Sequence, residues 1–272
     1  MIGLLALALQ LNSAVPKTPD VRPKAVPASP TRARPIVIVD AGHGGPDNGM
    51  TGAVGRTKIY EKNITLAVSK RLGAALVRRG VDVVYTRTTD TLIDLSDRGQ
   101  IANRAGGAVF ISVHVNAANP TWRDPSATRG FETYFLSDAH TDDAQRVEDM
   151  ENESVRFEAV KDLPKEDPLS FILSDMKQNE HLRESNELAE TIQRALSTVH
   201  PSPNRGVKQA GFRVLVTAFM PSVLVEIGFG TNPIDAAFIN DVDHQDTIAK
   251  AIADATMAYL AGYEQRVKGS RP

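Results

Sequence analysis

Short apolar runs that each end in a loop constrain the fold of this 272-residue chain more than any other feature. Each run has the length of a β-strand, and three of them lead into a histidine or a glutamate. In an open α/β sheet, side chains at the carboxyl ends of the strands meet in one crevice, where ligands bind. The runs are Pro35–Asp40, Ala108–Val113 and Ser222–Val225, and they lead to His43, His114 and Glu226.

The segments between these runs predict alternating helices and strands. Asn63–Arg79 places apolar residues at helical spacing, and the strand-like run Val81–Thr86 follows it. This rhythm predicts an α/β fold, a single domain in which a mixed, twisted β-sheet is flanked by helices on both faces. We expect further helices over Leu95–Ala105, after the capping residue Asp167, over Asn232–Asn240 and over Asp243–Ala261, and further strands over Phe131–Leu136, as a half-exposed strand, and Phe212–Val216.

Composition narrows the possible chemistry. The net charge is −2, and no basic stripe is interleaved with aromatic residues, so we expect no nucleic-acid partner. The chain has no cysteine, which excludes disulfides and thiolate ligands. Any metal must therefore bind through histidines and carboxylates. No long exposed apolar stripe is evident, so we expect a monomer.

The N-terminal residues differ from the rest. Ile2–Leu11 is apolar but too short for a membrane span of about 20 residues, so no stable span is expected. It resembles the core of a secretory signal without its basic start, so we expect 1–14 to be an incomplete signal sequence; a packed N-terminal helix is the alternative. The proline- and alanine-rich segment 15–34 is expected to be a disordered linker, followed by a catalytic domain over 35–263 and a flexible tail over 264–272.

Two histidines and two glutamates are candidates for metal-assisted chemistry. His43 lies between glycines, which permit a tight turn that exposes the imidazole. Two histidines and one glutamate would form a three-ligand zinc site with an open position, and the other glutamate would act as a base. Glu226 interrupts an apolar run, and burying a carboxylate is costly unless it is paired or binds a metal. The candidates are His43, Glu61, His114 and Glu226.

Each candidate has a simpler alternative. His43 alone would be a hydrogen-bonded loop residue, and His114 alone an ordinary core histidine. Glu61 alone would be a favourable charge at a helix N-terminus. The glycine-rich loop around His43 would also suit a phosphate, but the chain lacks both GxGxxG and a following Lys-Ser/Thr pair. Asn116 can either hydrogen-bond a substrate or hold its own loop.

Four motifs together carry a resemblance to a known family. In the order DAGHGG, YEKN, FISVHVNA and VLVEIGFGTN, they resemble the zinc-dependent N-acetylmuramoyl-L-alanine amidases, and more narrowly the secreted cell-separation amidases of Gram-negative bacteria. The resemblance covers about Pro35 to Tyr263. It implies one Zn²⁺ per chain held by His43, Glu61 and His114, with Glu226 as the catalytic carboxylate.

The resemblance also implies a reaction and a location. The reaction cleaves the amide between N-acetylmuramic acid and L-alanine in peptidoglycan, and the location is the periplasm, with a role in wall remodelling and daughter-cell separation. A zinc peptidase or deacetylase acting on another amide is the alternative. A non-enzymatic wall-binding module is disfavoured because all four chemical groups are present. Arg98 and Asn103 also match the family pattern, and we interpret both as structural.

The acidic segment Ser137–Leu163 interrupts the βα rhythm and predicts a helix with a thin apolar stripe. In the Gram-negative relatives, a helical segment at this place covers the active site until an activator protein displaces it, and one of its glutamates fills the open zinc position. The resemblance therefore implies an autoinhibitory segment, with Glu148, Glu151 and Glu153 as candidates and Glu151 preferred. The alternative is a solvated acidic helix.

Overall fold

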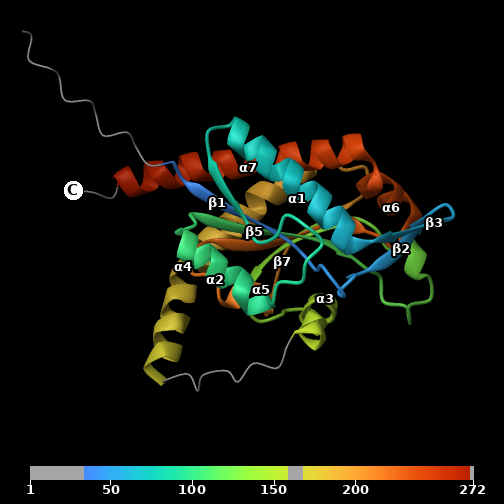
Figure 1. Ribbon diagram of the computed structural model, residues 1–272, viewed down its shortest axis with the longest axis horizontal. Coiled ribbons are helices and arrows are strands. Elements are labelled where there is room, and N and C mark those ends of the chain that lie inside the picture. Colours follow the sequence, from blue (N-terminus) through green and yellow to red (C-terminus); the bar gives the residue numbers. More distant parts are fainter. Residues whose placement is uncertain (1–33, 159–167, 270–272) are drawn as a thin grey trace, which may run out of the picture. The chain divides into compact units, whose positions relative to one another are not determined.

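The computed structural model describes residues 34–158 and 168–269 (Figure 1). The expected signal sequence, nearly all of the linker and the Asp167 cap lie outside the described residues. The strands are β1 Ile36–Ala41, β2 Thr51–Val54, β3 Thr57–Tyr60, β4 Asp82–Tyr85, β5 Val109–Asn116, β6 Phe131–Leu136, β7 Asn204–Ala210 and β8 Ser222–Phe229. The helices are α1 Glu61–Arg78, α2 Leu95–Ala105, α3 Asp142–Asn152, α4 Pro168–Leu196, α5 Arg213–Val216, α6 Pro233–Asn240 and α7 Val242–Gly269, with single helical turns η1 Pro125–Ala127 and η2 Glu153–Phe157.

Six strands form one mixed sheet in the order β4-β1-β5-β8-β6-β7. The strands β4, β1, β5 and β8 are mutually parallel, whereas β6 is antiparallel to β8 and parallel to β7. The prediction of a mixed sheet is therefore confirmed. Because β1, β5 and β8 are adjacent and parallel, their carboxyl ends lie at one edge of the sheet, where loops and side chains meet.

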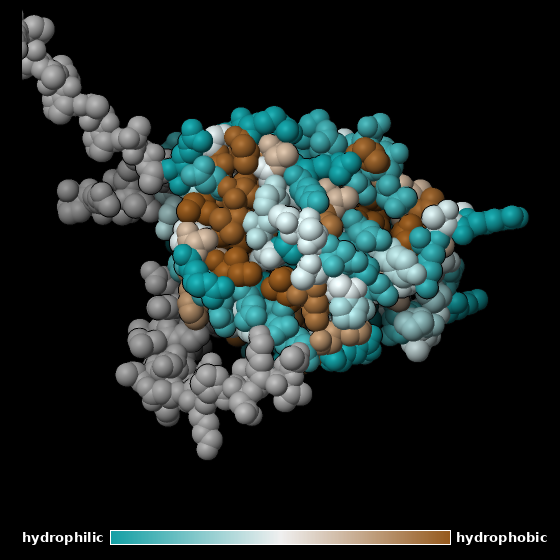
Figure 2. Space-filling view, in the orientation of Figure 1, coloured by the Kyte–Doolittle hydropathy of each residue, from teal (hydrophilic) through white to brown (hydrophobic). Residues whose placement is uncertain are grey.

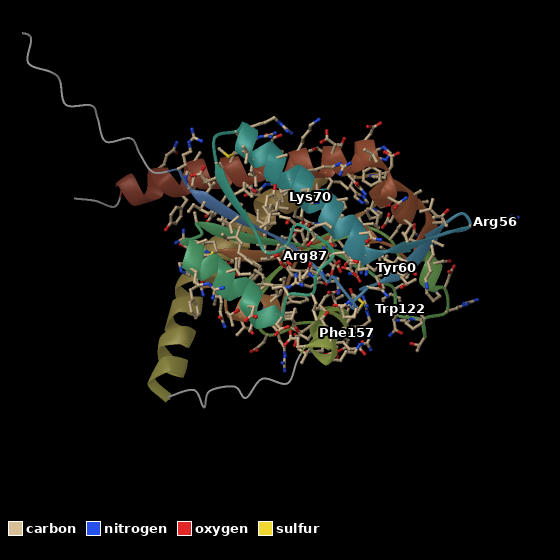
Figure 3. All side chains as sticks on the ribbon, in the orientation of Figure 1. Arg56, Tyr60, Lys70, Arg87, Trp122 and Phe157 are labelled. Carbon is tan, nitrogen blue, oxygen red and sulfur yellow. The ribbon has the colours of Figure 1, made fainter. Side chains whose placement is uncertain are left out.

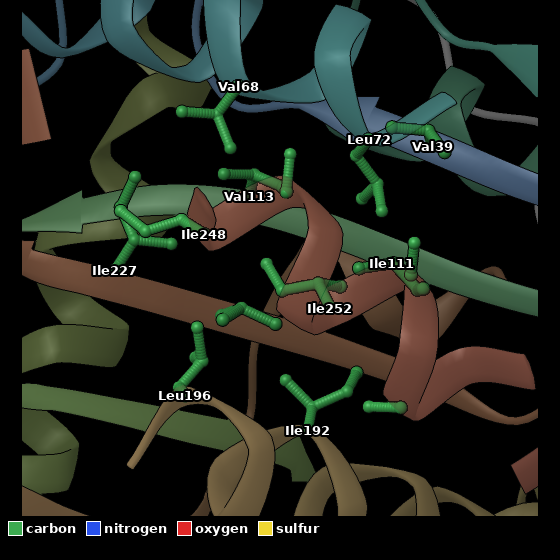
Figure 4. Close-up of a cluster of buried hydrophobic side chains, with 14 of the residues drawn as sticks. Val39, Val68, Leu72, Ile111, Val113, Ile192, Leu196, Ile227, Ile248 and Ile252 are labelled. Atoms are coloured by element: carbon green, nitrogen blue, oxygen red, sulfur yellow. The ribbon is translucent and has the colours of Figure 1, made fainter. Parts of the chain in front are cut away.

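Helices cover both faces of the sheet, as predicted. Alternate residues of each central strand point to opposite faces, so Val39 and Ile111 pack with α1, α4 and α7, while Ile38 and Phe110 pack with α2, α3 and α5. Figure 4 shows the first of these cores, in which Leu72 of α1 lies among the labelled strand residues. The two buried faces fix the register of the strands, because a slip of one residue would turn the side chains of each face toward the opposite one.

Two expectations about individual strands were wrong. The segment Phe212–Val216 forms the short helix α5 rather than a strand, with Val214 and Leu215 both buried and Phe212 edge-on to the Tyr134 ring at 5.0 Å. Neighbouring buried residues fit one turn of helix but not the alternation of a strand. Strand β6 is not half-exposed, since its first four residues are buried. It lies between β8 and β7, and its residues Phe131 and Tyr134 pack in the cores on opposite faces of the sheet.

The β2–β3 hairpin and β7 were not predicted. The hairpin has only four residues in each strand, and β7 has the sequence NRGVKQA, in which polar residues dominate. Both matter for the site, because the hairpin leads directly into α1 and β7 contributes two cationic side chains.

A buried ion pair fixes the end of β1. Asp40 is fully buried and accepts a hydrogen bond of 2.9 Å from Arg98 and further ones from the hydroxyls of Thr86 and Ser112. Burial alone would raise the pKa of the Asp40 carboxyl, but Arg98 and the two hydroxyls outweigh burial and hold this pKa below its usual value. Arg98 also donates to the carbonyl oxygens of Ala41 and His43, at 2.7 and 3.1 Å. The interpretation of Arg98 as structural agrees with these contacts.

A second buried arginine supports the same loop. Arg87 donates to the carbonyl oxygens of Ala41 and Gly42, at 2.9 and 2.7 Å, and to that of Lys62 in α1 at 2.9 Å. Figure 3 labels Arg87 in the middle of the molecule. The two arginines therefore hold the loop after β1 through hydrogen bonds to its backbone carbonyl oxygens. These contacts do not use the side chain of His43, which is left available for others.

Hydrophilic residues cover most of the face in Figure 2, with smaller apolar areas between them. Among residues 34–158 and 168–269, no helix combines the length and the apolar character that a membrane crossing requires.

We expect Arg98→Met to lower the free energy of unfolding by about 3–5 kcal/mol, because it leaves the Asp40 carboxylate buried without its cation. Denaturant unfolding followed by circular dichroism measures the change. Arg104→Met, on the exposed side of the same helix, is the matched control and should change stability by no more than about 0.5 kcal/mol. Equal effects of the two substitutions would show that the buried pair is not a major support of the fold.

Candidate metal centre

Four side chains from distant parts of the chain converge at the carboxyl edge of the sheet. They are His43 after β1, Glu61 at the start of α1, His114 on β5 and Glu151 near the end of α3, and their ligand atoms all lie within 4.8 Å of one another. The Glu61 Oε1 atom is 3.1 Å from both His43 Nε2 and His114 Nδ1. The Glu151 Oε2 atom is 3.1 Å from His43 Nε2 and 2.7 Å from His114 Nδ1.

The loop after β1 gives His43 its orientation. His43 is the one residue other than glycine with a positive φ in the described part of the chain, at 61°. This left-handed conformation is unfavourable for a residue with a Cβ atom, so the surroundings must impose it. The Nδ1 atom is 2.8 Å from Asp47 Oδ2, which also accepts from Ser154 at 2.7 Å, so Nε2 faces the cluster. The imidazole is buried beneath α3 and η2, whereas the sequence led us to expect it to be exposed.

Two glycines make room for the cluster. A Cβ atom on Gly42 would lie 2.5 Å from the His114 ring, and one on Gly49 would lie 2.5 Å from Glu61 Oε2 and 2.6 Å from the His43 ring. Side chains at these positions would therefore displace the groups that converge here. The glycine-rich sequence around His43 thus serves close packing around the imidazoles.

Backbone donors fix Glu61 in place. The hairpin β2–β3 ends at Tyr60, so Glu61 is the first residue of α1. Its Oε2 accepts from the backbone N–H of Met50 at 2.7 Å and its Oε1 from that of Val115 at 2.8 Å. Burial would raise the pKa of Glu61, but the two histidines lower it well below its usual value. Its carboxylate therefore remains ionised and rigid, as a metal ligand needs.

The orientation of the buried atoms fits a bound cation. Despite their short separations, His43 Nε2, His114 Nδ1 and both Glu151 oxygens lack a hydrogen-bond partner of acceptable geometry among the described residues. Burial would lower the pKa of His114, but Glu151 and Glu61 raise it to about 10, so the carboxylates demand positive charge here. Two imidazoles and two carboxylates around one point form a donor set that suits zinc.

Glu226 lies beside this cluster on the neighbouring strand. It is the register partner of His114 between β8 and β5, and it is fully buried. Neither of its carboxylate oxygens has a hydrogen-bond partner in the described part of the chain. Burial raises its pKa well above the usual value, and repulsion by Glu151 adds to the shift. A carboxyl group with a raised pKa next to a metal-competent cluster suits proton transfer.

The other acidic candidates of the inserted segment lie away from the histidines. Glu148 accepts from the backbone N–H of Gly211 at 2.7 Å, and Glu153 forms an exposed ion pair with Arg156 at 2.5 Å. Of the three glutamates considered, Glu151 alone contacts the two histidines. The segment forms α3 and η2 up to Phe157, while residues 159–163 lie outside the described part.

Two asparagines hold neighbouring segments. Asn116 donates to Glu132 Oε1 at 2.7 Å, and its own oxygen lies 3.4 Å from Arg146 of α3. Asn103 donates to the carbonyl of Thr217 at 2.7 Å, which agrees with a structural role. With α3 in place, Asn116 therefore links the sheet to this helix.

A charged cluster next to the site was missed in the sequence. It consists of Glu132, Asp143, Arg205 and Lys208. Glu132 interrupts the apolar run FETYFL in the way that Glu226 interrupts its own strand, and this signal identifies it as a buried acid. The two cations come from β7, which the sequence did not predict as a strand.

A mixed sheet with a buried His/Glu cluster at the carboxyl ends of its strands is the arrangement of an α/β domain that can hold a metal ion for hydrolysis. The sequence model of a family described as "N-acetylmuramoyl-L-alanine amidase" matches residues 37–257. The chain therefore belongs to the N-acetylmuramoyl-L-alanine amidase family, and it is an enzyme of this kind.

Individual relatives agree with this assignment. The chain is 32% identical to the N-acetylmuramoyl-L-alanine amidase AmiA of Salmonella typhimurium, over 97% of this chain and 91% of the relative. The crystal structure of an N-acetylmuramoyl-L-alanine amidase from Clostridium difficile 630 has a TM-score of 0.62 and 27% identity, covering 84% of this chain and 97% of the other. The CwlD amidase from Clostridioides difficile, solved in complex with the GerS lipoprotein, has a TM-score of 0.60 and 26% identity, with 84% and 99% covered.

We expect Asp47→Asn to weaken zinc binding by about 10–100-fold, because Asp47 orients His43 and favours metal binding at its Nε2. Competition with a chromophoric chelator measures the affinity. His244→Gln, which changes an exposed histidine of α7, is the control and should leave the affinity unchanged. Unchanged zinc affinity in Asp47→Asn would contradict the orienting role of Asp47.

Proposed function

We propose that this chain is an exported zinc amidase that hydrolyses the bond between N-acetylmuramic acid and L-alanine in peptidoglycan. Membership of the amidase family supports the substrate and the reaction. The single observation that carries the zinc mechanism is the convergence of buried imidazole and carboxylate atoms within 4.8 Å, with Glu226 in register beside His114.

We assign His43, Glu61 and His114 as the three protein ligands of one Zn²⁺. All three side chains are fixed by the fold itself, through Asp47, through backbone N–H donors and through strand β5. Bound there, the metal would supply Lewis-acid chemistry, polarising the amide carbonyl and lowering the pKa of water.

We assign Glu226 as the general base and acid of the reaction. Its carboxylate accepts a proton from the attacking water and passes it to the amine of L-alanine as the amide bond breaks. Burial within β8 keeps the group fixed and excludes competing solvent. The raised pKa makes the protonated form accessible, which the second transfer requires.

We expect Glu226→Gln to lower peptide release from purified peptidoglycan by at least about 100-fold while zinc is retained, because a proton-transfer step is lost. Chromatography with mass spectrometry identifies the products, and free peptides beginning with L-alanine indicate amidase activity. Asp254→Asn, on the exposed side of α7, is the control. Acetate or split peptides from the wild-type chain would instead favour the deacetylase or peptidase alternative.

We propose in addition that α3 is an autoinhibitory element. Glu151 occupies the space that the reacting amide needs, because its carboxylate touches both proposed histidine ligands. The helix has a small apolar face, with Ala144 and Val147 buried, so an activator protein can displace it for a modest free energy. Arg146 of α3 also lies over the Trp122 ring, 5.3 Å from its centroid.

We expect Glu151→Ala to raise the basal rate of peptide release by at least about tenfold, because it removes the carboxylate that would fill the open position of the proposed zinc site while the rest of α3 stays. The rate is measured on zinc-loaded protein without any activator. Glu153→Ala, two residues along and exposed, is the matched control and should leave the rate unchanged. If both variants keep the wild-type rate, Glu151 does not block the site.

The proposed setting of this enzyme is the periplasm, in wall remodelling and daughter-cell separation, with activity as a monomer. The apolar run near the N-terminus supports export. The structure of the CwlD amidase contains a lipoprotein partner, which supports an activator protein as the partner of this chain. Such a partner would have to compete with the contacts that hold α3.

A further inference from the structure

A second charged cluster lies next to the proposed active site. The Oε2 atom of Glu132 is 2.9 Å from Arg205 Nε and 2.6 Å from Lys208 Nζ. The Oδ2 atom of Asp143, from α3, is 3.0 Å from Arg205 Nη2 and 2.8 Å from the same lysine nitrogen. The two cations are thus shared between a carboxylate of the sheet and a carboxylate of the autoinhibitory helix.

The register of the sheet places this cluster in line with the metal centre. His114 on β5 pairs with Glu226 on β8, and Glu226 pairs with Glu132 on β6. Two strand spacings, about 10 Å, therefore separate Glu132 from His114. An irregularity in the pairing of β6 with β7 opposite Glu132 leaves Arg205 beside it. The peptide that follows the cleaved amide in the substrate can reach from the metal centre to this cluster.

Release of α3 would leave this cluster short of negative charge. The sheet supplies one carboxylate, Glu132, and its Oε1 atom is already occupied by Asn116 and Tyr134, at 2.7 and 2.8 Å. Without Asp143, Arg205 and Lys208 share the remaining oxygen of Glu132. Half-buried cations with too few carboxylates attract an anion from solution or from a substrate.

We propose that Arg205 and Lys208 form a subsite that binds a carboxylate of the substrate's peptide, and that Asp143 occupies this subsite when α3 is docked. This inference rests on the proposed function. Asp143 and Glu151 are eight residues apart on one helix, about 12 Å along its axis. An extended peptide of about three or four residues spans the same length. The helix therefore mimics an acidic peptide, with Glu151 at the reacting end and Asp143 at the far end.

Both cations of the subsite are partly exposed, Arg205 at 26% and Lys208 at 19%. A cavity of about 350 Å³ lies between β7, α3 and α4, and Val207, Lys208, Thr141 and Ala144 are among the residues that line it. The cavity therefore leaves free space beside Lys208.

Two substitutions should change peptide binding in opposite directions, and the test uses this difference. All variants are made in the full zinc-loaded chain that carries Glu151→Ala. The probes are an acidic peptide that begins with L-alanine and has a free carboxylate at its third residue, and the same peptide with that group as an amide. Equilibrium dialysis gives the two dissociation constants, and peptide release from peptidoglycan gives KM and kcat.

We expect Lys208→Gln to weaken binding of the acidic peptide by about tenfold or more and to abolish its preference over the amide, because a charge-assisted hydrogen bond is lost. KM should rise with little change in kcat. Asp143→Asn should tighten binding, because it removes the internal competitor. Lys208→Arg should restore binding, and Lys250→Gln, an exposed lysine of α7, should change nothing.

If the cations only dock α3, Lys208→Gln and Asp143→Asn will shift binding in the same direction, and the proposal is overturned. Equal affinities for the acid and the amide would overturn it as well. Peptide release with an unchanged KM in Lys208→Gln would reject the subsite while leaving the amidase assignment intact. Selective binding of the acidic peptide without peptide release by any variant would support the subsite and reject the amidase assignment.

Discussion

The buried ion pair between Asp40 and Arg98 is the interaction on which the site depends. It lies at the end of β1, and Arg98 also binds the carbonyl oxygens of Ala41 and His43. Together with Arg87, it holds a loop in which His43 has a left-handed backbone. Backbone strain of this kind costs roughly 1–3 kcal/mol and persists only where the surroundings impose it. The two buried arginines thus fix the backbone of the loop, and with it the direction of the His43 imidazole.

Much of the fold could be predicted from the sequence because the strong signals come from buried, periodic segments. The runs at β1, β5 and β8 and the amphipathic helix α1 were recognisable, since both faces of the sheet are buried. The strand β7 was missed because its sequence is polar, and Phe212–Val216 was mistaken for a strand because so short an apolar run has no clear period. Hydrophobic patterns report on the core and say little about polar edge strands.

Some residues of the candidate site could be predicted from the sequence and others could not, for the same reason. His43, His114 and Glu226 follow or interrupt apolar strands, so topology alone places them together. Glu151 shares the buried face of α3 with Ala144 and Val147, but a role at the metal centre could be assigned to it only through a family resemblance. Glu132 carries a recognisable signal, an acid that interrupts an apolar strand, but its partners on β7 were not predictable, since the register of β6 with an unpredicted strand and an irregularity in that pairing bring them together. Contacts between elements remote in sequence are set by packing, which a single sequence does not display.

The contact between Arg146 and Trp122 would give the proposed autoinhibitory helix an optical signal of its position. Trp122 is the sole tryptophan of the chain, and in the docked arrangement a guanidinium group of α3 lies over its ring. In the proposed mechanism, departure of α3 would remove that cation and change the polarity around the indole. The emission of the unlabelled protein would then report on the position of the helix, and the proposed equilibrium between closed and open forms would be measurable apart from catalysis.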